Sequence, residues 1–156
     1  MPRVTTEQIF QALFNIAKTL QGADWSGSPI ALQSSSRNWV KTGETADGSM
    51  PALYQLDPRE ESDVRTGLGR SRRILHAQLD IRIQREQPDQ YSDAQPFSTI
   101  LNNWVDNLYL LFSPSDNATL GGLVADCYPK SNRIDYGTDA SRVAIIYTIM
   151  EIVTGG

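Results

Sequence analysis

Cysteine and histidine are scarce in this chain of 156 residues, which contains one of each, Cys127 and His76. A lone cysteine cannot form a disulfide bond within the chain, so nothing indicates an oxidising compartment. One histidine and one cysteine cannot supply the nitrogen and sulfur ligand sets that zinc prefers. We expect Cys127 to be a small buried residue near a strand, as free cysteines usually are.

The sequence offers few residues from which a catalytic site could be built. A serine or cysteine triad needs a histidine as proton carrier. His76 falls on the polar side of a predicted strand, in register with Asp80 and Arg82, where a solvent-facing position is the simpler expectation. The aspartates of the C-terminal third are not spaced as an EF-hand loop. We therefore predict that the chain is not an enzyme and that it uses no cofactor and no metal.

Long hydrophobic runs are also absent. No stretch approaches the roughly 18 consecutive apolar residues of a membrane span, and the first residues lack the apolar core of a signal peptide. We expect no membrane partner and assembly in the cytoplasm where the chain is made. The 14 basic residues are outnumbered by 18 acidic ones, for a net charge of -4. The overall field therefore opposes non-specific binding to nucleic acid, and any such contact has to be local.

The composition that remains is that of an ordinary globular protein, with 40% apolar and 21% charged residues. Because domains commonly have about 100–200 residues, we predict a single domain over residues 1–156. Apolar residues recur at helical spacing near its start, and Thr5 with Gln8 three residues later matches a capping box. The first helix is predicted over residues 5–20, with Gly22 as its stop.

A wide apolar stripe predicts a second helix over residues 97–112, ended by Ser113-Pro114. The clearest strand alternates apolar and polar residues over 75–83. Further strands are predicted at 52–56, 123–128, 133–136 and 142–153, with short strands or turns within 23–51. The fold class is α+β: a mostly antiparallel sheet with two main helices packed on one face and a long hairpin loop.

Two features of these strands bear on association. The last strand, 142–153, is apolar on both faces, so it is either central in the sheet and covered on both sides or partly covered by another subunit. The segment 57–73 is almost wholly polar and is predicted to be the hairpin loop.

That loop opens acidic and closes with four arginines: Arg65, Arg70, Arg72 and Arg73. It is either a solvated hairpin tip or an arm whose arginines contact an acidic partner surface or a passing nucleic-acid backbone.

The order of elements resembles the tail terminator, or tail completion, protein family of long-tailed bacteriophages. The resemblance rests on four segments and spans most of the chain. They are the opening amphipathic helix, the strand Arg73-Ile-Leu-His-Ala-Gln-Leu-Asp-Ile-Arg-Ile, the step Leu120-Gly121-Gly122-Leu123-Val124 and the closing strand Val143-Ala-Ile-Ile-Tyr-Thr-Ile.

The resemblance implies a virion structural protein at the head-tail junction. Such a protein forms a ring, typically of six subunits, that caps the tail tube and provides the surface on which the head docks. Its partners would be copies of itself, the tail tube protein, neck or connector proteins and, without sequence preference, the passing DNA. Three alternatives stay open: another neck ring protein, a non-viral small α+β ligand-binding module with a pocket lined by Trp104, Tyr109 or Tyr147, or an enzyme that uses only carboxylates, for which the sequence singles out no particular aspartate.

Overall fold

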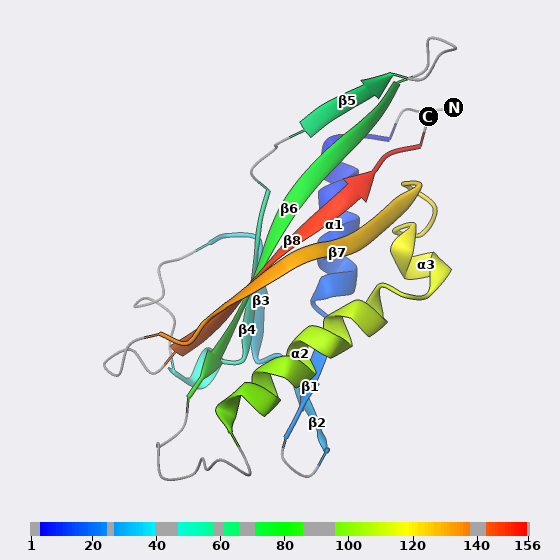
Figure 1. Cartoon of the computed structure of the whole chain (residues 1–156). Helices are drawn as coiled ribbons and strands as arrows, with labels where there is room; N and C mark the ends of the chain where they lie inside the picture. Colours follow the sequence, from blue (N-terminus) through cyan, green and yellow to red (C-terminus); the bar gives the residue numbers. More distant parts are fainter. Residues whose placement is uncertain are drawn as a thin grey trace.

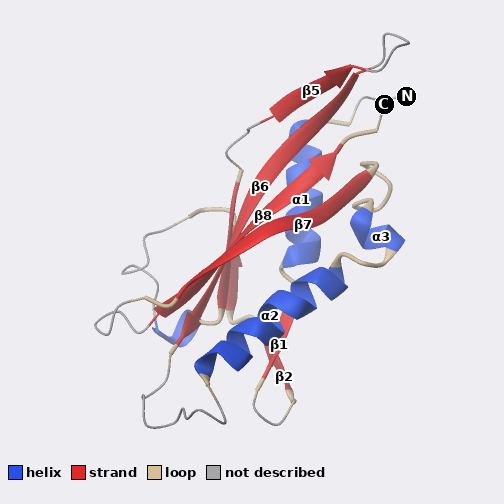
Figure 2. Ribbon diagram, in the orientation of Figure 1, coloured by secondary structure: helices blue, strands red, loops and turns tan. Residues whose placement is uncertain are grey.

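The computed structural model describes residues 4–24, 27–39, 47–57, 61–65, 71–85, 96–137 and 143–155, with the backbone alone at residues 47, 61–65, 71 and 72. Its main feature is a mixed, mostly antiparallel sheet against which two long helices, α1 and α2, are packed (Figures 1 and 2). The predicted α+β class, with both helices on one face, is confirmed.

The sheet follows a path of five strands, β3-β4-β6-β8-β7, and β5 pairs with β6 beside this path. In path order the strands are β3 (Ser34–Ser36), β4 (Ala52–Leu56), β6 (Ser71–Gln84), β8 (Val143–Val153) and β7 (Asp126–Asp135), with β5 at Glu61–Arg65. Only β3 and β4 are parallel. Two short strands, β1 (Gln21–Ala23) and β2 (Pro29–Ala31), form a separate antiparallel pair.

The two longest strands, β6 and β8, lie side by side at the centre, from Ile74 opposite Val153 to Gln84 opposite Val143. The alternation predicted for β6 is confirmed, because Leu75, Ala77 and Leu79 are buried on the face toward the helices. We call this the inner face and the opposite one the outer face. β8 is central, between β6 and β7. This agrees with the first of the two explanations offered for its apolar sequence, a central position in the sheet.

The first helix, α1 (Thr6–Ala17), begins as predicted at Thr5, whose hydroxyl accepts from the Gln8 N–H while the Gln8 side chain accepts from the Thr5 N–H. It ends at Ala17, earlier than predicted, and Gly22 is not its stop. Gly22 instead lies in β1.

The second helix, α2 (Phe97–Leu111), has Phe112 as its C-cap, so Ser113-Pro114 follows its end as predicted. A short helix, α3 (Ser115–Ala118), comes next and was not predicted.

One hydrophobic core lies between the inner face and the two helices. Burying a large apolar side chain contributes about 1.5–3 kcal/mol, so the core is the main source of stability. Its largest fully buried members include Trp104 and Leu108 from α2, Leu13 from α1, and Leu79 and Ile146 from the sheet. Figure 1 shows α1 crossing behind β8 and β7.

Two loop predictions are wrong in part. β7 runs on from Asp126 to Asp135, where two shorter strands joined by a turn were predicted. A β-bulge between Pro129 and Ser131 replaces that turn, and proline is tolerated because β7 is at the sheet edge.

Within the segment predicted as a loop, 57–73, residues of β5 pair antiparallel with the start of β6, Arg65 opposite Ser71. The described part of the segment therefore forms two paired strands of a hairpin, which extend beyond the helices at one end of the sheet (Figure 1).

Arg37 links the segment after β3 to two other elements. Its guanidinium donates to Glu7 and Gln11 on α1, and Nη2 lies 2.6 Å from Asp57 Oδ2 at the end of β4. The hydrogen bonds to Glu7 and then to Asp57 raise the pKa of Arg37 above its ordinary value, although partial burial opposes them. A second contact joins β4 to α1, since the Gln55 amide donates a hydrogen bond to the Phe10 carbonyl at 2.9 Å.

Gly22 packs directly beneath Trp104, and a Cβ at this position would overlap the indole ring. We expect Gly22→Ala to lower the free energy of unfolding by about 1–3 kcal/mol, because the fully buried indole has to shift within the core to admit the new methyl group. Urea unfolding followed by tryptophan fluorescence measures the change. Gly48→Ala is the matched control, since nothing lies within 4 Å of its added Cβ. Equal destabilisation by the two substitutions would contradict this packing.

Candidate functional site

Of the four arginines predicted to form an interaction arm, Arg73 is the one whose side chain the structure describes. Arg65 lies in β5 and Arg72 in β6, where the structure describes the backbone alone, and Arg70 lies outside the described residues. The side chain of Arg73 is described and turns to the body of the protein, where Nη1 donates to Thr6 Oγ1 at 3.4 Å. Its backbone pairs with Thr154 just beyond β8. Arg73 is thus part of the base of the hairpin.

The outer face is the other candidate surface, because neither α1 nor α2 covers it. One end of this face is closed by a small cluster of Met50, Ala52, Val143 and Ile145, with Tyr54 and Tyr147 packed against it. Toward the other end, Ile74, Ile149 and Val153 remain only half-buried. Apolar residues in that state on a sheet face favour contact with another surface.

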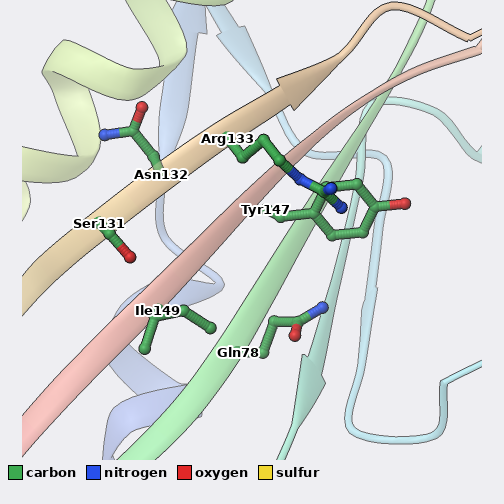
Figure 3. Close-up of a pocket in the computed structure, with 6 residues that line it drawn as sticks. All are labelled: Gln78, Ser131, Asn132, Arg133, Tyr147 and Ile149. Atoms are coloured by element: carbon green, nitrogen blue, oxygen red, sulfur yellow. The ribbon is translucent and has the colours of Figure 1, made fainter.

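A hollow of about 300 Å³ lies on the outer face, across β6, β8 and β7. Its lining residues are Gln78, Ser131, Asn132, Arg133, Tyr147 and Ile149. The Arg133 guanidinium lies over the Tyr147 ring, with Cζ 4.9 Å from the ring centroid, as Figure 3 shows. The register places Gln78, Ile149 and Ser131 in one row across the strands. The hollow thus has an apolar and aromatic floor with one cation at its rim.

A buried charged cluster adjoins this hollow. The Asp80 carboxylate accepts from Trp39 Nε1 at 3.0 Å and from Gln78 Nε2 at 2.7 Å. Burial raises the pKa of Asp80, while these two hydrogen bonds and the charge of Arg82 oppose the rise. Arg82 is fully buried, with Cζ 4.3 Å from the Tyr54 ring centroid and 5.5 Å from that of Trp39. The cluster therefore fixes Gln78, which links it to the hollow.

His76 lies on the polar side of β6, as predicted, but it is half-buried and its Nε2 is 3.7 Å from Glu151 Oε1. Glu151 also accepts from the Tyr128 hydroxyl and lies 3.6 Å from Lys130 Nζ. The hydrogen bond from Tyr128, followed by the charges of Lys130 and His76, lowers the pKa of Glu151, and partial burial opposes them. This arrangement is an ion cluster that ties β6, β8 and β7 together on the outer face.

Cys127 is buried in β7, as predicted. Burial, with a smaller contribution from the charge of Asp126, raises the pKa of its thiol to about 12. The thiolate that reacts with electrophiles is therefore scarce near neutral pH.

Within the described part of the chain, no group of three or more histidine, cysteine or acidic residues is placed to hold a metal ion. No helix among the same residues is long and apolar enough to cross a membrane.

The three aromatics considered from the sequence for a ligand pocket lie in three different places, and Tyr147 is among the residues that line the hollow. Trp104 is fully buried in the core, Tyr109 is exposed on α2, and Tyr147 lies on the outer face.

Sequence reasoning placed Gln78, Tyr147 and Ile149 in strands but did not bring them together with Arg133. The signal that it lacked is the register between β7 and β8, which places Arg133 opposite Tyr147. Comparison of the sequence with models of protein families and with curated proteins finds no match to either.

Replacing Tyr128 tests the cluster around Glu151. Because the folded pKa of Glu151 is lowered, its carboxylate stabilises the fold above the unfolded pKa of about 4.3, and this contribution is lost as pH falls through the folded value. In Tyr128→Phe we expect Glu151 to titrate at higher pH and the stability advantage of the wild type to shrink below pH 4.3. NMR titration of the Glu151 carboxyl and urea unfolding at several pH values measure both effects. An unchanged Glu151 titration would contradict the assignment.

Proposed function

We propose that this chain is a structural protein of a phage virion at the head-tail junction, of the tail terminator kind. Copies of it form a ring, typically of six subunits, that caps the tail tube and offers the surface on which the head docks. Its work is done by interfaces and involves no catalysed reaction. In this proposal the protein assembles in the host cytoplasm and resides at the neck of the virion.

The observation that carries the proposal is the part of the outer face that neither α1 nor α2 covers and where described apolar residues remain half-buried. A sheet of this size has one face packed on both long helices, while the opposite face keeps half-buried apolar residues and a hollow floored by Tyr147 and Ile149. Leaving such a surface in water is less favourable than covering it with a neighbour. The order of helices and strands adds support, because it is the order on which the resemblance to tail terminators rests.

The hairpin of β5 and β6 provides a second feature suited to a ring. It extends beyond the helices (Figure 1), and its segment contains Arg65, Arg70 and Arg72. An arginine-rich hairpin in each subunit would place positive charge where a protein of net charge -4 otherwise repels nucleic acid. We propose that these arginines contact an acidic partner or the backbone of passing DNA.

Size-exclusion chromatography with light scattering, across protein concentration and salt, tests the ring. We expect a closed species with a mass near six times the 17.3 kDa of one chain, and negative-stain electron microscopy should show a central opening. Another ring size would fit a different neck ring protein, the first alternative. A monomer at every concentration would contradict the ring and favour a ligand-binding module, for which the hollow is the candidate site.

Neutralising the hairpin tests the arm. We expect Arg70→Gln combined with Arg72→Gln to weaken binding to duplex DNA, and to lower the slope of log affinity against log salt by about 2 if both contact phosphates. Fluorescence anisotropy of a labelled duplex at several salt concentrations measures this slope. The matched control is Lys18→Gln with Lys130→Gln, which removes the same charge from exposed positions elsewhere. Indistinguishable slopes for the two double variants would contradict a role in DNA contact.

A further inference from the structure

We propose that the hollow on the outer face is filled by the exposed side of α2 from a second copy of this chain. This contact rests on the ring assembly proposed above and names the surfaces that would build it. The α2 surface comprises Asp106, Tyr109 and Leu110, which we call the α2 ridge. Leu110 enters the hollow of the neighbouring copy, and Asp106 pairs with Arg133 of that copy.

The α2 ridge is an unusual surface for a helix whose opposite side is in the core. Leu110 is 66% exposed and Tyr109 41% exposed, whereas Trp104 and Leu108 of the same helix are fully buried. Asp106 is exposed and lies one turn before Leu110, so their side chains share one side of the helix. The ridge therefore presents an apolar knob flanked by a single negative charge.

The hollow complements this ridge in shape and in charge. Ile149 and Tyr147 form an apolar floor, and a volume of about 300 Å³ far exceeds the roughly 30 Å³ that one water molecule occupies in the liquid. It can therefore accept a branched aliphatic side chain. Arg133 is the only charged residue among those that line it, and its guanidinium is held over Tyr147 (Figure 3). A carboxylate beside the apolar knob matches that fixed cation.

The two surfaces lie on opposite sides of the sheet, so one copy can present both at once. Tyr109 of the ridge accepts a hydrogen bond from Asn132 at 3.3 Å. Asn132 borders the hollow, but its register position is opposite Thr148, which is buried on the inner side. The next residue, Arg133, belongs to the hollow. A contact between different surfaces of identical chains is head-to-tail, and such contacts close into rings when the rotation between copies allows.

Charge also favours this pairing over a contact between like surfaces. Each copy has a net charge of -4, so copies repel one another at long range. Two hollows brought face to face would add the repulsion of two Arg133 side chains, and two ridges that of two Asp106 side chains. Of these three pairings, the ridge in the hollow is the one that brings Asp106 and Arg133 together.

Charge reversal tests the contact. We expect Arg133→Glu and Asp106→Arg, each alone, to raise the protein concentration for half-assembly about tenfold or more, because like charges are then juxtaposed. The double variant, and an equimolar mixture of the two single variants, should assemble again within about threefold of the wild type, because each restores opposite charges at every contact. Light scattering over a concentration series measures assembly. Lys18→Glu, at the exposed C-cap of α1, is the matched control for Arg133→Glu and should leave assembly unchanged.

A second substitution tests the knob. Leu110→Ser removes the apolar side chain from an exposed position, so the fold should keep its wild-type urea midpoint while assembly weakens about tenfold. If the wild type forms a ring that survives Arg133→Glu and Leu110→Ser, this contact is overturned and the ring proposal stands. If the single charge variants dissociate and the mixture does not recover, the two residues are not partners and the contact is likewise overturned. A wild type that stays monomeric overturns both proposals.

Discussion

The pairing of β6 with β8 is the constraint on which the remaining structure depends. Its register aligns the inner residues of both strands into one apolar floor, on which α1 and α2 pack. A slip by one residue would turn every inner side chain of one strand to the outer face, so the core selects this register strongly. The same register places Gln78 beside Ile149, and the outer face is therefore organised by the packing of the inner one.

Buried charge divides the outer face into two parts. Arg82 and Asp80 are buried under Trp39 at one end, and burying such groups is costly unless they are paired and hydrogen-bonded. Stacking on Tyr54 and the hydrogen bonds to Asp80 offset that cost. The neighbouring part of the face keeps its arginine, Arg133, exposed over an aromatic ring. Arg82 is thus part of the folded interior, while Arg133 remains accessible to a partner.

Periodic patterns could be predicted from the sequence, but the meeting of distant segments could not. The sequence predicts the helices near Ile9 and Trp104 and the strand around Leu79, because burial of one side imposes a period on neighbouring residues. The bulge at Pro129 was mistaken for a turn, since proline and polar residues mark both features. The hollow was missed because Arg133 reaches Tyr147 only through a strand register that local propensity does not encode.

Pro129 has a consequence for how this chain can grow into larger structures. Among the described strands, β7 pairs on one side only and lies at the margin of the sheet, and such margins template the addition of further strands, as in amyloid. A missing N–H and a bulge in the middle of β7 interrupt that template. Continuous sheet growth from one molecule to the next is thereby discouraged at this edge.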